Sequence, residues 1–301
     1  MEVGRHKERR EEWSLREKTI TKCDTYKYLG EEIARDGKNK TNLEERFKKV
    51  KNIVMAIMTC ARNDVMRNIE TQVLIKLHDT VTLPAFLYNA ETWVLNCSER
   101  KEVDKVEIWA WKHMLGLPIT TPNPAVVFAT GSLYASVRVD QKRLVYLQQL
   151  LQKPKDHWAQ MALNLMNDHN CGWAKSINET LESWDLERQW NNIAKKSKVS
   201  WKTEVTKAAE KINTETIRKE CYKRVTSSVE LKSKSKSIIQ ELDRPDYKRK
   251  PLEIMSYSSV IAARATIMGR YGMLQCKKNF FLVVETKIVM FVQPLMMKTI
   301  E

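Results

Sequence analysis

The sequence predicts a mainly α fold: a helical bundle with one short β-hairpin near the N-terminus, followed by a looser helical basic region. Helix breakers are few, since the 301 residues include only 8 Gly and 8 Pro, and this favours long helices. Apolar residues recur at spacings of three and four in several segments, which is typical of helices with one buried face. With 43% hydrophobic residues, the chain is long enough and apolar enough to bury a sizeable core.

The hairpin is predicted over residues 19–33. Its centre, Tyr26-Lys27-Tyr28-Leu29-Gly30, is an aromatic-rich run that ends on a glycine, and its alternation allows either face to be buried. Asp36-Gly37 is a turn signal before the first long helix. Taken alone, such a stretch is more typical of a structural hairpin than of a functional site.

The first long helix is predicted to open at Thr41, with Glu44 three residues later in the capping-box pattern. Its apolar stripe consists of residues spaced by three and four: Leu43, Phe47, Val50, Val54, Ile57 and Ala61. At about 100° per residue, Arg46 and Lys51 flank this stripe on opposite sides, while Lys48 and Lys49 point away from it. The basic face is either simply solvated or in contact with phosphates, and the sequence leaves both interpretations open.

Further helices follow. Residues 69–83 predict a second apolar-periodic helix that Pro84 kinks or ends, with Ile69, Val73, Leu77 and Val81 inward. Ser98 is predicted to cap a third helix that stops at Gly116 and Pro118. Its inward positions are Val103, Val106, Trp109, Ala110, Met114 and Leu117. Pro124 can open a short helix, and residues 137–151 form another amphipathic one.

The chain is predicted to divide into five parts. These are a charged tail (1–18), a helical domain with the hairpin (19–153), a Trp-rich helical region (154–226), a basic Ser/Lys linker (227–251), and a C-terminal helix with an apolar tail (252–301). Tryptophans at irregular spacing usually fill seams between helices, and this is the favoured interpretation. Among Lys and Arg, however, they can also stack on single-stranded bases.

The net charge indicates the kind of binding partner, and the cysteine usage indicates the cellular compartment. A net charge of +15 favours a polyanionic partner such as nucleic acid over an anionic membrane surface. The six cysteines are scattered singly, and His169-x-Cys171 lacks a second pair of ligands at a suitable spacing, so we expect no metal and no cofactor. No signal peptide or membrane span is apparent, which predicts an intracellular protein, nuclear or cytoplasmic. The oligomeric state is not indicated.

Four short motifs occur along the chain in an order that matches a known protein family. They are Tyr28-Leu29-Gly30, Leu43-x-x-Arg46-Phe47, Leu87-Tyr88-Asn89-Ala90-Glu91-Thr92-Trp93 and Met114-Leu115-Gly116. This order resembles the segment after the palm in reverse transcriptases of non-LTR retrotransposons. In that family the Tyr-Leu-Gly hairpin lies by the primer-grip region and the following helices form the thumb, so the resemblance implies a thumb-like domain over residues 19–153.

A fifth motif is also similar to the family, whereas other positions of this sequence differ from the family's pattern. Arg270-x-x-Met273-Leu274-x-x-Lys277-x-Asn279-Phe280 looks like the segment that leads into the family's C-terminal zinc-binding module, but residues 281–301 contain no Cys or His. Asn42 stands where the family usually has an acidic residue, and Asn89 stands where it has a glycine.

The catalytic chemistry of the family is not expected here. A reverse transcriptase needs palm carboxylates that hold a pair of Mg²⁺ ions, whereas this chain has no Asp-Asp pair and only a short charged tail before Tyr26. We therefore expect a catalytically incomplete fragment, not an enzyme, that binds RNA or an RNA–DNA duplex non-specifically. The residues expected to contact nucleic acid are Tyr28, Leu29, Gly30, Arg46, Lys48, Lys49 and Lys51.

Two other interpretations stay open from the sequence. One is a helical remnant or protein-interaction scaffold whose basic charge serves solubility alone. The other is a part of an intact RNA-directed DNA polymerase, if a palm lies upstream in a longer product. Clustering of Lys and Arg on one face of the folded protein would favour nucleic-acid binding over the scaffold.

Overall fold

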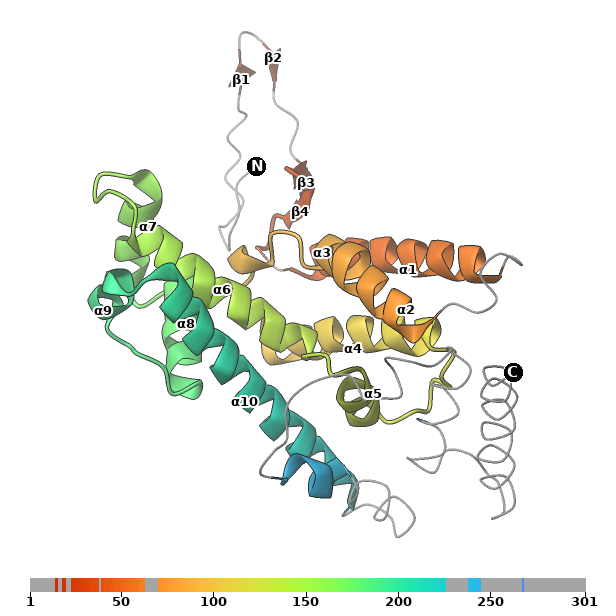
Figure 1. The fold of residues 1–301 in the computed structure, drawn as a ribbon. Helices are drawn as coiled ribbons and strands as arrows, with labels where there is room; N and C mark the ends of the chain where they lie inside the picture. The colour runs from red at the N-terminus through yellow and green to blue at the C-terminus, as the bar shows by residue number, and fades with distance from the viewer. Residues whose placement is uncertain are drawn as a thin grey trace, which may run out of the picture.

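Two short antiparallel strand pairs precede a series of helices in the computed structural model (Figure 1). The structure describes residues 14–15, 18–19, 23–37, 39–62, 70–225, 238–244 and 267. Strands β3 (Thr25–Tyr28) and β4 (Glu31–Ala34) form the predicted hairpin, with Tyr26 opposite Ile33 and Tyr28 opposite Glu31. Strands β1 (Ser14–Leu15) and β2 (Lys18–Thr19) also pair, where the predicted charged tail (1–18) meets the start of the predicted hairpin. The mainly α fold with an N-terminal hairpin is therefore confirmed.

Helix α1 (Lys40–Arg62) follows the hairpin and packs against β4, α3 and α4. It begins one residue before the predicted Thr41. Leu43, Val50 and Val54 are buried as the apolar spacing predicted. Phe47 is 36% exposed and instead meets Trp109 edge-on, with ring centroids 5.5 Å apart.

The second predicted helix has a different inward face. It runs as α2 (Thr71–Leu77), a π-helical turn η2 (His78–Thr82) and α3 (Leu83–Phe86), so Pro84 does not end it. Its buried residues are Thr71, Leu74, His78, Thr82 and Phe86. The predicted stripe was wrong, since Val73 and Val81 are 41% and 44% exposed. Among the polar side chains that turn inward, His78 stacks on Trp111, with ring centroids 4.0 Å apart.

A short 3-10 turn, η3 (Ala90–Thr92), leads into helix α4 (Cys97–Met114). The N-cap of α4 is Asn96 rather than the predicted Ser98, and Asn96 forms a capping box with Glu99. Helices α5 (Asn123–Thr130) and α6 (Ala135–Leu151) follow. The predicted inward positions Val103, Val106 and Met114 are buried in a core shared with α1 and α3.

The Trp-rich region forms α7 (Trp158–Asp168), α8 (Gly172–Ser183), α9 (Trp190–Lys195) and the long α10 (Lys198–Val225). Helix α10 packs along α6 (Figure 1). Trp184 and Trp201 are buried in one core with side chains of α5 and α6, whereas Trp158 is 76% exposed. One hydrophobic core therefore contains residues from both sides of the domain boundary predicted near residue 153.

Part of the predicted basic linker is also a core element. Residues 238–242 form a helical turn whose Ile238, Ile239 and Leu242 are buried against the core that contains α10. The linker prediction for this part of residues 227–251 was wrong, because its apolar residues are spaced so that they face one side of a helical turn. The motif at residues 270–280 and the apolar tail lie outside the described residues.

Candidate nucleic-acid interface

The tip of the β3–β4 hairpin is the two-residue turn Leu29-Gly30. Both residues have positive φ, 46° for Leu29 and 83° for Gly30, which is the geometry of a type I′ turn. Gly30 suits this conformation, whereas Leu29 carries a branched side chain there and is 74% exposed. The tip thus holds an apolar side chain out to solvent in a strained backbone. Tyr26 and Tyr28 on β3 are also more than half exposed.

Arg46 fixes this tip to α1. Its Nη2 donates to the Gly30 carbonyl at 3.1 Å, and its guanidinium lies 5.1 Å from the centre of the Tyr88 ring. Arg46 is only 3% exposed, so this member of the residues expected to contact nucleic acid is buried rather than open to a ligand. Burial lowers the pKa of Arg46, and the negative charge of Glu31 partly opposes that effect.

Glu31 joins the hairpin to the segment that follows α3. Its Oε1 accepts from Trp93 Nε1 at 2.7 Å and from Asn42 Nδ2 at 3.4 Å, and its Oε2 accepts from Asn89 Nδ2. Asn89 has a φ of 58°, a conformation that Asn tolerates almost as Gly does. The two departures from the family pattern, Asn42 and Asn89, therefore both donate to one carboxylate.

These contacts bring separated motifs together. Gly30 and Glu31 of the hairpin, Arg46 of α1, and Asn89 with Trp93 meet around one polar centre. Sequence reasoning did not single out Glu31, although a carboxylate directly after the turn and opposite Tyr28 was visible. Its role depends on hydrogen bonds from Asn89 and Trp93, which lie 58 and 62 positions later in the sequence. Local hydrophobic periodicity carries no information about such distant contacts.

Helix α1, which packs against β4, carries a basic face. Lys48, Lys49 and Lys51 are exposed, as the helical spacing predicted. Lys48 Nζ is 2.6 Å from Glu45 Oε1, and this hydrogen bond is the main reason that the pKa of Glu45 is lowered and that of Lys48 is raised. The charge of Lys27 on β3 also acts on Glu45, which places Lys27 near the same face. We call Lys27, Tyr28, Leu29, Lys48, Lys49 and Lys51 the hairpin–α1 surface.

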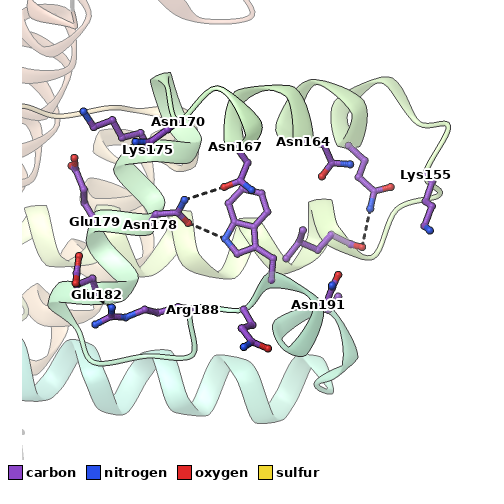
Figure 2. Close-up of a pocket in the computed structure, with 15 residues that line it drawn as sticks. Lys155, Asn164, Asn167, Asn170, Lys175, Asn178, Glu179, Glu182, Arg188 and Asn191 are labelled. Atoms are coloured by element: carbon purple, nitrogen blue, oxygen red, sulfur yellow. Dashed lines mark hydrogen bonds and ion pairs between the residues drawn. The ribbon is translucent and has the colours of Figure 1, made fainter.

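A polar cleft lies elsewhere, among α7, α8 and α9 (Figure 2). Its volume is about 950 Å³, and most of its lining side chains are amides, Lys, Arg and Glu. It does not include any residue of the hairpin–α1 surface.

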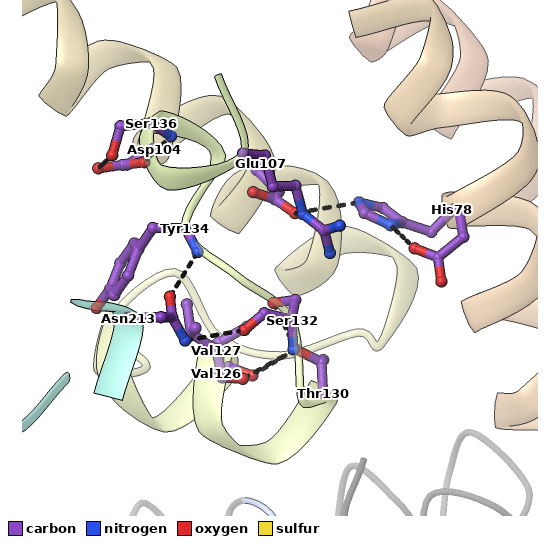
Figure 3. A network of polar contacts seen from close by, with 12 residues as sticks. His78, Asp104, Glu107, Val126, Val127, Thr130, Ser132, Tyr134, Ser136 and Asn213 are labelled. Carbon is purple, nitrogen blue, oxygen red and sulfur yellow. Dashed lines mark hydrogen bonds and ion pairs between the residues drawn. The ribbon is translucent and has the colours of Figure 1, made fainter. Parts of the chain in front are cut away.

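A buried titratable cluster lies between η2, α4 and α6 (Figure 3). Glu107 is 3% exposed, and its Oε1 is 3.9 Å from His78 Nε2 and 3.6 Å from Arg138 Nε. Burial raises the pKa of Glu107 to about 8 and, against two hydrogen bonds from Ser136, raises the pKa of Asp104 to about 7. Burial lowers the pKa of His78.

No protein-family model matches this chain, and searches of curated proteins and of solved structures found no match either. Among the residues that the structure describes, no group of three or more His, Cys, Asp or Glu side chains is arranged to hold a metal ion. Within the same described part, no helix is both long enough and apolar enough to cross a bilayer.

Replacing Leu29 by asparagine should raise the free energy of unfolding by about 0.5–1 kcal/mol, because Asn adopts positive φ more readily than Leu. Little burial is lost, since the Leu29 side chain is largely exposed. Urea unfolding of the two proteins measures the difference. Leu29→Ala keeps the backbone penalty and is the control, and a lower stability for Leu29→Asn than for Leu29→Ala would contradict the assignment of strain.

Proposed function

We propose that this protein binds nucleic acid non-specifically, RNA or an RNA–DNA duplex, through the hairpin–α1 surface, as a thumb-like part of a non-LTR reverse transcriptase would. The observation that carries the proposal is the attachment of the hairpin to α1 through two contacts, Arg46 to the Gly30 carbonyl and Asn42 to the Glu31 carboxylate. Because of it, the hairpin with its exposed apolar side chains is fixed to the helix that carries the exposed lysines.

The residues of this surface have different proposed roles. Lys48, Lys49 and Lys51 contact phosphates, whose charge attracts a strongly basic protein. Tyr28 and Leu29 present apolar surface to sugars or bases at the tip. Arg46 acts indirectly, since it is buried and holds the Gly30 carbonyl. We propose no catalytic step and no cofactor.

The salt dependence of binding tests this assignment. Each phosphate contact contributes about −0.9 to the slope of log K against log salt on duplex DNA. Replacing Lys48 and Lys49 together by Gln should therefore flatten the slope by roughly two and weaken binding to all sequences about equally. Folding should survive, since both side chains are exposed. Fluorescence anisotropy at several salt concentrations gives both quantities.

The matched control is Lys202→Gln with Lys207→Gln, which removes the same charge from exposed positions of α10. We expect its slope to stay close to that of the parent protein. Equal losses from the two double variants would mean diffuse electrostatic attraction, and the hairpin–α1 surface would then have no special role. Circular dichroism of both variants verifies that their helices are intact.

A further inference from the structure

The cleft among α7, α8 and α9 has an unusual lining of amide side chains. Gln160, Asn164 and Asn167 follow one another on α7 at spacings of four and three, so they share one face of that helix. Asn191 of α9 lines the opposite wall, and Figure 2 shows amides from both walls directed into the space between them. An amide offers both donors and an acceptor without charge.

Part of this lining is held in place by the protein. Asn178 Nδ2 donates to Asn167 Oδ1 at 3.0 Å, and Trp190 Nε1 donates to Asn178 Oδ1 at 3.0 Å. One polar relay therefore fixes an amide and an indole in the cleft wall. Gln160 donates through Nε2 to the Leu151 carbonyl, while its buried Oε1 accepts no hydrogen bond from the described residues. The cleft thus has fixed polar groups in its wall, together with one buried amide oxygen that has no hydrogen bond from the described residues.

The charges around the cleft lie at its margins. Lys155 is at one end and Lys175 is at the other (Figure 2). Arg188 is engaged with Glu182 at 3.1 Å, and the carboxylate of Glu179 remains near Lys175. The interior is therefore suited to an uncharged hydrogen-bonding ligand whose ends carry negative charge.

We infer that this cleft binds a single-stranded segment of nucleic acid through the edges of its bases. Amide side chains form paired hydrogen bonds with adenine, an indole can stack on a base, and lysines at the ends can contact phosphates. The net charge of +15 favours such a polyanion over a neutral saccharide or a basic peptide. The inference goes beyond the proposed function, since it concerns other helices and another part of the ligand.

The test replaces Asn164 and Asn191 together by Ala. Both side chains are exposed and no hydrogen bond from either is found among the described residues, so the fold should persist. The probes are a labelled oligoadenylate and an abasic oligonucleotide of the same length, which has the phosphates without the bases. We expect the parent protein to prefer the oligoadenylate. In the double variant its affinity for the oligoadenylate should fall roughly tenfold or more, while the abasic probe binds as before.

The matched control is Gln72→Ala with Gln149→Ala, which removes two exposed amides from α2 and α6, outside the cleft. Its binding of both probes should be unchanged. The salt slope of the cleft variant should also be unchanged, because no phosphate contact is lost, whereas the Lys48 and Lys49 variant changes the slope on a duplex. The two experiments therefore distinguish a wrong proposal for the cleft from a wrong proposal for the hairpin–α1 surface. No preference for the oligoadenylate, or equal losses on both probes, would overturn the inference and leave another class of ligand, such as an extended peptide.

Discussion

Replacing Glu31 by alanine is expected to lower the free energy of unfolding by about 2–4 kcal/mol. The carboxylate accepts from Trp93 Nε1, Asn89 Nδ2 and Asn42 Nδ2, and Trp93 is only 2% exposed. Without Glu31 these donors lose their acceptor, and two of them, on Trp93 and Asn42, are buried. Arg46 also loses the negative charge that opposes the effect of its burial.

Glu31→Gln separates the two contributions, since it keeps an acceptor and removes the charge. We expect its stability to lie between those of Glu31→Ala and the parent protein. Urea unfolding gives the free energies, and hydrogen exchange of the β3–β4 amides reports whether the hairpin detaches from α1. A loss below about 0.5 kcal/mol for Glu31→Ala, the size of an ordinary surface change, would show that the polar centre does not hold the hairpin.

Stability is expected to fall as the pH rises, by about 2 kcal/mol between pH 6.5 and pH 8. Glu107 has a pKa of about 8 in the folded protein, against an ordinary value of 4.5, because it is buried. The folded chain therefore keeps a proton that the unfolded chain releases, and each rise in pH across this range favours unfolding. Asp104, with a pKa raised from 3.8 to about 7, acts in the same direction up to about pH 7.

His78 has a smaller, opposite effect. Burial lowers its pKa from 6.5, so the folded state prefers the neutral ring, and its contribution to stability rises with pH until the unfolded ring has lost its proton, about one pH unit above 6.5. Between pH 6.5 and pH 8 the two carboxylates therefore outweigh His78. Glu107→Gln should flatten the stability profile there, and urea unfolding at a series of pH values measures both proteins. A parent profile that rises over this range would contradict a protonated Glu107.

The fold was predictable wherever one face of a helix is plainly apolar. Leu43, Val50 and Val54 of α1 and Val103 and Met114 of α4 are buried as their spacing indicated. The prediction failed where polar side chains are buried. His78 enters the core because Trp111 offers it an aromatic face, and that contact joins helices distant in sequence.

The candidate site was predictable only in part. The outward direction of Lys48 and Lys49 follows from helical geometry and is confirmed, while their contact with phosphates stays a prediction. The burial of Arg46 was not foreseen, because a charged residue at the edge of an apolar stripe is usually exposed. Its partners, Gly30 and Tyr88, come from other segments that only the folded chain brings near.

The wide turn η2 also determines how this chain should be aligned with others. Leu83 N–H donates to the His78 carbonyl, five residues back, so the turn contains one residue more than an α-helical turn. It lies directly before Pro84, whose ring would otherwise meet the carbonyl four residues earlier. A relative with a plain α-helix here will align through a one-residue gap between positions 78 and 82. With that gap the helix faces on its two sides stay in register, whereas without it the aligned positions would be offset by about 100°. In this helix, gain or loss of a single residue during evolution is therefore best accommodated at that turn.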